Sequence, residues 1–444
     1  MRPLKRTPAT VAAFQQLVDG STGIVQDLRE TAVAPGCPDL FVYGSTTADT
    51  RPFFGHRANV QNSGAAPTRL GARVAAVGEA VERYCTACWD RGDLRVGTWS
   101  ELADDPSLPR PVHPDQLQLL LPGQTKTGRY ASFSTDTRLA WAQVWSLTRR
   151  APTMLPASQV FLPYRPSAPG ESEVFGTYST GVAAAANVHE ATFFGLCEAI
   201  ERDAFMNAWL NRLALPRVDH LADADWAADF ARIYDRPGLR YHVLDATTDV
   251  GVPVAICALV DHAESPVLYS ISAACHLDMR VAVGKAVLEA AHGYLWVRSL
   301  RERPRAFPRG ARGLHSFEDH VAWHASGREL EATRFLWEGE RPTRALDHHP
   351  VPALADFGEA VDHLVARLAD VGVEATAAEV TTADVESLGI AVVRTFCPEL
   401  IPLHAGMDCV PLACPRLYTL PGRMGLGPDP TGPQDLHTAP HPFP

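Results

Sequence analysis

A five-residue pattern occurs twice in this chain, and each copy places two glutamates on one side of a predicted helix. The copies are Glu-Ala-Val-Glu-Arg at 79–83 and Glu-Ala-Ile-Glu-Arg at 198–202. Glutamates three positions apart share a helix face. A turn rich in small residues is expected before each helix, at 62–66 and 179–181. The repeat predicts two pseudo-equivalent helices, and a duplication that retains helix-packing ion pairs is the plainer explanation.

The helix predicted around the second copy is strongly apolar, yet it carries three glutamates. At about 100° per residue, Glu190, Glu198 and Glu201 fall within a wedge of about 80° on one face. A buried carboxylate is costly unless it is paired or bound to a metal. Ion pairs with Arg202 and its neighbours would meet this need. Two facing helices of this kind would instead offer four carboxylates to Mg²⁺, which proteins hold with a few carboxylates and substrate phosphates.

Length and charge exclude several classes of protein. The chain has 444 residues and a net charge of −11, so a nucleic-acid partner is not expected. Its apolar runs are too short for a membrane span, and its basic N-terminus is not followed by the apolar core of a secretion signal. Nine cysteines without a framework spacing indicate reduced thiols and a cytoplasmic location.

Periodicity predicts a mixed chain with one core. We expect a single α+β domain, because no second, independent core is evident. The predicted helices are 4–30, which either Thr7 before Pro8 or Thr10 would cap, and 278–300 and 357–368. The predicted strands are 40–43, 130–134, 139–147, 160–162, 240–244, 252–260, 267–274, 373–380 and 390–396, while 313–350 is expected to be irregular.

The acidic motifs resemble those of the YcaO family, ATP-dependent enzymes that activate backbone amides of peptides. The matching segments are 78–84, 181–187 with Glu190, and 195–204. The resemblance implies the YcaO fold, an α+β fold whose two pseudo-equivalent halves of mixed or antiparallel sheet carry helices around a central nucleotide site. It also implies three parts: an N-terminal segment packed on the core, a catalytic domain and a proline-rich tail that returns to the active site (1–56, 57–425 and 426–444).

The resemblance implies ATP and Mg²⁺ as cofactors and gives roles to residues of this chain. Mg²⁺ is expected on four glutamates, namely Glu79, Glu82, Glu198 and Glu201. The nucleotide is expected on Asn187, Glu190 and Arg202, and more weakly on Arg83 and Lys285. For Lys285 the alternative is a surface salt bridge with Glu289, four residues further along the predicted helix.

Two positions depart from the family pattern. Many members have a lysine where this chain has Ala65, and a serine where it has Ala75. Both departures remove polar nucleotide contacts but leave the carboxylates in place. We therefore expect a working site with altered phosphate contacts, and a degenerate site is the alternative.

The C-terminal stretch is rich in proline and ends in Pro-His-Pro-Phe-Pro at 440–444. Composition alone would predict a disordered end. Such a terminus is the mark of the azoline-forming members of the YcaO family. Polyproline II is already stiff, so placing it in a cleft costs little entropy. The resemblance thus implies that the terminal carboxylate of Pro444 acts beside the nucleotide, as a positioning group or base.

The implied activity is that of a peptide cyclodehydratase. A Cys, Ser or Thr side chain of a ribosomal precursor peptide, with leader and core, attacks the preceding carbonyl, and ATP phosphorylates the resulting oxygen. Family members of this type usually need a partner that binds the leader, and we expect a separate E1-like or ThiF-like protein. A homodimer is compatible with the sequence. The alternatives are a YcaO enzyme that forms thioamides or amidines, and a catalytically silent scaffold.

One basic segment stands out on this acidic chain. It carries six arginines between Arg298 and Arg312 and is broken by prolines. A solvated loop is the first interpretation, and a docking site for an acidic peptide or partner is the second.

Overall fold

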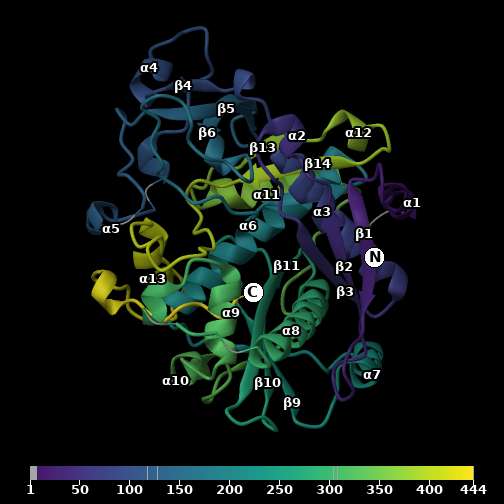
Figure 1. Ribbon diagram of the computed structural model, residues 1–444. Coiled ribbons are helices and arrows are strands. Elements are labelled where there is room, and N and C mark those ends of the chain that lie inside the picture. Colours follow the sequence, from purple (N-terminus) through teal and green to yellow (C-terminus); the bar gives the residue numbers. More distant parts are fainter. Residues whose placement is uncertain (1–7, 118, 128, 304, 308, 444) are drawn as a thin grey trace.

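The computed structural model describes residues 8–443 except 118, 128, 304 and 308, and it arranges them in three sheets with helices between and around them (Figure 1). The strands are β1 Val25–Thr31, β2 Phe41–Thr47, β3 Gln61–Ala66, β4 Arg95–Gly97, β5 Leu139–Ser146, β6 Ala151–Pro156, β7 Val182–Ala185, β8 Arg217–Asp219, β9 Leu239–Asp245, β10 Val254–Asp261, β11 Leu268–Cys275, β12 Thr343–Ala345, β13 Thr376–Glu379 and β14 Ala391–Phe396. The helices are α1 Pro8–Gln16, α2 Arg51–Phe54, α3 Arg69–Ala87, α4 Trp99–Ala103, α5 Pro122–Thr127, α6 Val188–Leu210, α7 Ala224–Ile233, α8 Met279–Arg301, α9 Phe317–Ala325, α10 Leu330–Thr333, α11 Phe357–Asp370, α12 Ala383–Glu386 and α13 Leu420–Met424.

The first acidic helix, α3, lies on a three-stranded antiparallel sheet in the order β1-β2-β3. The side chain of Thr68 caps its N-terminus by accepting a hydrogen bond from the Gly71 N–H. The strand that precedes it is built from small and polar residues, and a Cβ at Gly64 would lie 2.2 Å from the Ala76 nitrogen. The absence of a side chain at Gly64 therefore lets α3 pack directly on β3.

The second acidic helix, α6, follows β7, an outer strand of a six-stranded sheet in the order β4-β5-β13-β14-β7, with β6 paired to β5. Helix α6 packs against β14, β7, β11 and α11, so it is covered on most sides. Gly181 adopts a φ of +84°, and its own Cβ would lie 2.3 Å from the Thr395 carbonyl oxygen. This turn needs glycine, and it fixes where the chain enters β7 and α6.

The third sheet has the order β11-β10-β9-β8-β12, and β9, β10 and β11 form an antiparallel meander. Helix α8 packs on β10 and β11, while α6 contacts these strands as well (Figure 1). Strands β10 and β11 are buried along their whole length, as their continuous apolar sequences require. The sheet therefore places α6 and α8 near one another, each with charged residues within an apolar core.

Several sequence expectations are confirmed in this part of the chain. Strands β9, β10 and β11 match the three predicted ones, and α8 and α11 match the two predicted helices. The α+β class and the antiparallel pairing are also as expected.

Other expectations are wrong. The helix predicted for 4–30 is the shorter α1, which ends at Gln16 and is followed by strand β1. Thr10 lies within α1 and not before it, and residues 1–7 lie outside the described residues. Segments 130–134 and 160–162 are not strands, whereas 151–156, which was not among the predicted strands, forms β6. The segment 313–350 contains helices α9 and α10. Of the two small-residue segments expected to be turns, 62–66 forms most of strand β3, whereas 179–181 is a turn that leads into β7, as expected.

Among the described residues, no helix combines the length with the apolar content that spanning a bilayer requires. The proline-rich C-terminal stretch does not extend away from the protein. His441 and Phe443 are almost fully buried, and the backbone of the stretch accepts hydrogen bonds from Trp209 and His324. The stretch thus packs beside α6 and α9.

Candidate functional site

A cleft of about 390 Å³ lies where α3, α6 and α8 meet. Glu82 comes from α3, Glu198, Glu201 and Arg202 come from α6, and the other charged residues come from α8. Its lining is Glu82, Val182, Ala183, Phe194, Cys197, Glu198, Glu201, Arg202, His276, Val281, Lys285 and Glu289. Four carboxylates and two cationic side chains thus face one solvent-accessible space.

The first glutamates of the two motifs have the same environment. Glu79 Oε2 accepts a hydrogen bond from the Ser63 N–H at 3.2 Å, and Glu198 Oε2 accepts one from the Gly181 N–H at 3.0 Å. Their other oxygens pair with the arginine four residues later, Arg83 or Arg202, at 3.2 Å in both cases. The repeated motif therefore produces a repeated geometry, in which each helix is joined to the segment that precedes it.

The second glutamates of the two motifs differ. Glu82 Oε1 accepts a hydrogen bond from the Ala184 N–H at 2.9 Å, so this side chain reaches from α3 to β7. Glu201 is only 5% exposed, and its Oε1 lies 3.4 Å from Arg202 Nε. One glutamate joins the two units, while the other lies deep in the cleft beside the arginine of its own motif.

Burial dominates the electrostatics of the deep part of the cleft. It raises the pKa of Glu201 well above the ordinary value, with Glu289 and Glu198 adding to the shift, while the positive charges of Arg202 and Lys285 oppose it. Burial likewise raises the pKa of Glu289. Arg202 and Lys285 therefore do not fully compensate the four carboxylates of the cleft, and an additional cation would lower the cost of keeping these carboxylates ionised.

The donor set fits a magnesium–nucleotide. Carboxylate oxygens are hard ligands suited to Mg²⁺, and Arg202 and Lys285 supply the positive charge that phosphates require. Among the described residues, the cleft carboxylates do not bring three ligand atoms within 4.8 Å of one another; only Asp245, His348 and His349 do so. Asp245 Oδ2 also pairs with Arg344 at 2.6 Å, so that group already has a cationic partner.

The structure gathers some of the candidate residues and separates others. Glu82, Glu198, Glu201, Arg202 and Lys285 line the cleft. The remaining candidates, Glu79, Arg83, Asn187 and Glu190, are not part of its lining. Asn187 caps α6, because its Oδ1 accepts a hydrogen bond from the Glu190 N–H at 2.9 Å, and Glu190 is fully buried behind it.

Sequence reasoning missed two residues of the cleft, Glu289 and His276. The sequence suggests Glu289 only as the partner of Lys285 in a surface salt bridge, which is the alternative to a role of Lys285 at the nucleotide. The structure places both on the cleft wall instead. The available signal was their spacing on a helix that is otherwise apolar on that side, whereas His276 follows β11 and carries no local signature.

The C-terminal residues reach α6 next to the cleft. The Phe443 ring lies 4.2 Å from the guanidinium carbon of Arg202 and 4.6 Å from the ring of Phe205, measured to the ring centroids. Phe443 therefore lies against the Arg202 guanidinium, and the contact combines apolar packing with a cation–π interaction. Pro444, the candidate catalytic residue, lies outside the described residues.

A family model described as YcaO cyclodehydratase, ATP- and Mg²⁺-binding, matches residues 63–401. The chain belongs to the YcaO family. Two curated relatives are uncharacterised proteins, from Methanothermobacter thermautotrophicus and, in the 3′ region of tfuA, from Rhizobium leguminosarum bv. trifolii. Each is 29% identical, over 52% and 51% of this chain and 56% and 53% of their own length. The chain therefore spans about half the length of the curated relatives it matches.

Solved structures share the fold of this YcaO protein. A heterocyclase in complex with substrate and cofactor has a TM-score of 0.80 and 23% identity, over 100% of this chain and 58% of that one. The YcaO protein of Methanopyrus kandleri bound with AMPPCP and Mg²⁺ has a TM-score of 0.61 and 18% identity, over 90% and 91% of the two chains. The E. coli microcin synthetase McbBCD complex has a TM-score of 0.54 and 13% identity, over 84% and 88%. These likenesses concern the fold.

Proposed function

We propose that this protein is an ATP-dependent cyclodehydratase that converts Cys, Ser or Thr residues of a ribosomal precursor peptide to azolines. The observation that carries the proposal is the cleft, which combines Glu82, Glu198 and Glu201 with Arg202 and Lys285. The description of the family as ATP- and Mg²⁺-binding cyclodehydratases supports it.

In this proposal, the carboxylates of the cleft hold Mg²⁺, which would neutralise the triphosphate when bound. Glu201 and Glu198 face the cleft beside Arg202, while Glu82 keeps the wall from α3 in place through Ala184. Glu79 would complete the set from the same face of α3. Arg202 and Lys285 would bind phosphate oxygens. Asn187, Glu190 and Arg83 would either contact the nucleotide or support the residues that contact it.

The proposed reaction depends more on the positioning of the reacting groups than on general acid–base catalysis. The side-chain oxygen or sulfur of the peptide attacks the preceding carbonyl carbon, and the carbonyl oxygen accepts the γ-phosphoryl group of ATP. Loss of that oxygen as phosphate leaves the azoline. Because phosphoryl transfer depends on alignment and charge neutralisation, a cleft with fixed cationic groups suits it.

The buried C-terminal stretch supports the azoline-forming class over the thioamide- or amidine-forming one. Phe443 packs on Arg202, and Trp209 donates a hydrogen bond to the Ala439 carbonyl at 3.1 Å. We propose that the carboxylate of Pro444 takes part in the reaction as a base or positioning group. A separate leader-binding partner of the E1-like or ThiF-like kind would present the precursor, as the McbBCD complex is itself an assembly.

The test is reconstitution with a candidate precursor peptide, a candidate partner, ATP and Mg²⁺. We expect each ring to lower the peptide mass by one water and to release one phosphate. Deletion of Pro444 is expected to slow cyclisation by about a hundredfold, the scale of a positioned acid or base. The matched control is Pro428→Ala, which changes an exposed proline of the same stretch.

Each result of this reconstitution that differs from the expected one would lead to a different conclusion. Unchanged cyclisation without Pro444 would refute the role of the terminal carboxylate. Exchange of oxygen for sulfur in the product would identify a thioamide-forming enzyme. Absence of ATP hydrolysis, even with precursor and partner present, would contradict the cyclodehydratase and favour a peptide-binding scaffold.

A further inference from the structure

A second and larger hollow, of about 740 Å³, lies at the C-terminal end of α3, apart from the carboxylate cleft. Three segments form it: α2 and the residues after it, the residues just beyond α3, and the stretch around Pro163. It shares no lining residue with the carboxylate cleft. It is therefore a separate feature that the proposed chemistry does not use.

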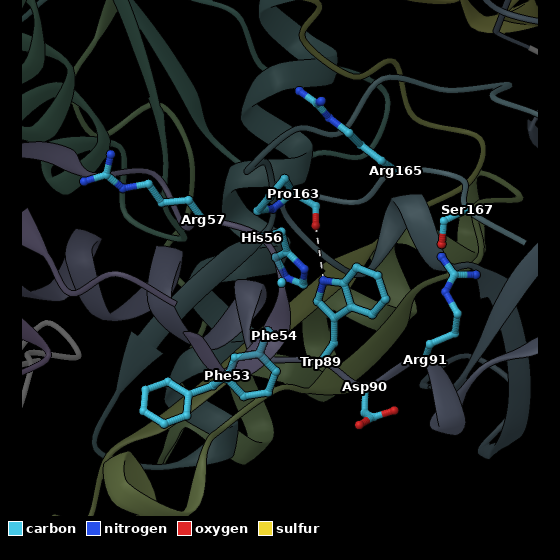
Figure 2. A pocket seen from close by; sticks show the side chains of 11 residues that line it. Phe53, Phe54, His56, Arg57, Trp89, Asp90, Arg91, Pro163, Arg165 and Ser167 are labelled. Carbon is cyan, nitrogen blue, oxygen red and sulfur yellow. Dashed lines mark hydrogen bonds between the residues drawn. The ribbon is translucent and has the colours of Figure 1, made fainter. Parts of the chain in front are cut away.

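The floor of this hollow is a rigid aromatic platform. The His56 and Trp89 rings stack with centroids 4.7 Å apart (Figure 2), and Phe161 stacks on Trp89 with centroids 5.7 Å apart. His56 Nε2 donates a hydrogen bond to the Ala87 carbonyl at 2.6 Å, and Trp89 Nε1 donates one to the Pro163 carbonyl at 3.1 Å. The platform is thus held in place without a ligand, which lowers the entropy lost on binding.

An exposed apolar side chain extends the platform at its rim. Phe53 is 83% exposed although it belongs to α2, and Phe54 lies beside it (Figure 2). Large aromatic residues are enriched where proteins bind partners, and few single residues of this size are left so accessible. Together with Trp89 they form an apolar surface suited to an aromatic or branched aliphatic side chain.

The charge of the hollow is opposite to that of the whole protein. Its lining includes Arg57, Arg91 and Arg165 and one carboxylate, Asp90, a formal charge of +2, whereas the chain carries −11. Arg91 pairs with Glu171 at 3.2 Å. Arg57 and Arg165 are exposed and form no ion pair within 4 Å among the described residues. Figure 2 shows the arginines arranged around the central Trp89.

We propose that this hollow binds an acidic segment of the precursor peptide, one in which an aromatic or branched apolar side chain is flanked by carboxylates. The apolar side chain would lie on His56 and Trp89, and the carboxylates would pair with Arg57 and Arg165. The identity of the peptide as a precursor rests on the proposed function; the binding chemistry does not.

The position of the hollow suits a peptide that also reaches the cleft. Helix α3 carries Glu82 on the cleft wall and ends at Ala87, whose carbonyl is bonded to His56. At 1.5 Å and about 100° per residue, these residues are about 7.5 Å apart along the axis and about 140° apart around it, so a peptide that reaches both sites would pass around the helix. A segment held here would keep the neighbouring part of the same peptide close to the carboxylates.

The basic segment 298–312 is a weaker candidate for the same ligand. Arg305 pairs with Glu318 and Asp319, and Arg301 donates a hydrogen bond to the Pro266 carbonyl. Arg298 lies 3.3 Å from the Cys37 sulfur. Several of its arginines are therefore already engaged with other groups of the protein.

The experiment uses fluorescence anisotropy with the full chain and a labelled probe peptide, Gly-Glu-Phe-Glu-Glu-Leu-Asp-Gly, at constant ionic strength. The double variant Arg57→Glu/Arg165→Glu is expected to weaken binding at least about tenfold, because both attractions become repulsions. A probe with lysine at the acidic positions should bind this variant better than it binds the unmodified protein. A merely structural role of the two arginines would not produce this reversal.

Controls make the proposal refutable. Arg309→Glu, an exposed arginine of the basic segment, should leave the affinity within about twofold. A probe with glycine in place of phenylalanine and leucine should bind at least about tenfold more weakly. Equal binding of acidic and basic probes, an equal loss with Arg309→Glu, or displacement of the probe by an ATP analogue would overturn the proposal. Failure of the proposed reaction would appear separately, as absent phosphate release.

Discussion

The β3–α3 unit and the β7–α6 unit use the same motif in different surroundings. In both, the first glutamate bonds a backbone N–H of the preceding segment and pairs with the arginine of its motif. The first glutamates are similarly exposed, with 34% of the Glu79 side chain and 26% of the Glu198 side chain accessible, whereas among the second glutamates Glu82 is half-buried and Glu201 is only 5% exposed. Helix α6 is also covered by the C-terminal stretch, and α3 has no such cover among its described contacts.

This difference separates two consequences of one sequence pattern. In α3 the second glutamate bonds across to β7 and so holds the two units together. In α6 the second glutamate is buried among other carboxylates, where its ionised form is unfavourable. A motif that stabilises the fold in one unit is therefore costly in the other. Residues retained at a cost to stability are characteristic of functional sites.

The largest contrast is expected between Glu201→Gln and Glu79→Gln. Burial holds the pKa of Glu201 above its unfolded value, so its contribution to stability falls as the pH rises above about 4.5. The glutamine lacks this penalty and should raise the free energy of unfolding of the nucleotide-free protein at pH 7 by about 1 to 3 kcal/mol. It should also lower kcat/KM of the proposed reaction by about 10² to 10³-fold.

Glu79→Gln should behave in the opposite way in the stability measurement. This side chain is accessible and paired with Arg83, so its replacement should leave the free energy of unfolding unchanged or slightly lower. Urea denaturation and phosphate-release kinetics on both variants make the comparison. A loss of stability with Glu201→Gln, or equal stability changes for both, would show that the two units do not differ in the way described.

Much of this comparison is visible in the sequence, because it depends on local spacing. The i, i+3 glutamates and the arginine after them specify both helix faces, and the apolar residues around Glu201 indicate which helix is buried. Strands β9 to β11 could be predicted for the same reason, since continuous apolar runs of that length indicate buried strands. The structure brings three of the four motif glutamates into one cleft.

The other features of the fold and of the cleft depend on contacts between residues that are far apart in the sequence. Strand β3, Gln-Asn-Ser-Gly-Ala-Ala, has almost no intrinsic strand propensity and is held by the ladder to β2 and by close packing of α3. Strand β6 begins and ends near proline, which suggests a turn, yet it pairs with β5 alone and so tolerates proline at a sheet edge. Glu289 joins the cleft only because α6 and α8, which pack on opposite faces of the β9–β11 sheet, both line the cleft, and no local pattern specifies this.

The histidines around the C-terminal stretch should make the second unit sensitive to acid. His441 lies with its ring centroid 4.4 Å from His320 and 4.7 Å from His404, and all three are buried. Burial lowers the pKa of His320 to about 4 and those of His404 and His441 well below the ordinary value of 6.5. The unfolded chain therefore binds more protons than the folded one between about pH 4 and 6.5, and stability rises with pH across this window.

Lowering the pH from 7 to 5 should reduce the free energy of unfolding by about 2 kcal/mol for each such histidine. The variant His404→Leu tests the contribution of one of these histidines to the pH dependence, because neither ring nitrogen of His404 has a hydrogen-bond partner among the described residues. The variant should be at least as stable at pH 7 and should show a smaller loss at pH 5, measured by urea denaturation at both values. An unchanged pH dependence would mean that His404 is already protonated, or accessible, in the folded protein.

The last comparison concerns the hydrogen bond that joins the two units. Glu82→Ala removes the acceptor of the Ala184 N–H and should lower the free energy of unfolding by about 1 to 3 kcal/mol, the cost of leaving a buried donor unsatisfied. Glu82→Gln keeps an oxygen in the same place and should cost less than about 0.5 kcal/mol, although it removes a charge from the cleft. If the two variants were equally stable, the hydrogen bond from α3 to β7 would not contribute to joining the halves, and Glu82 would serve the cleft alone.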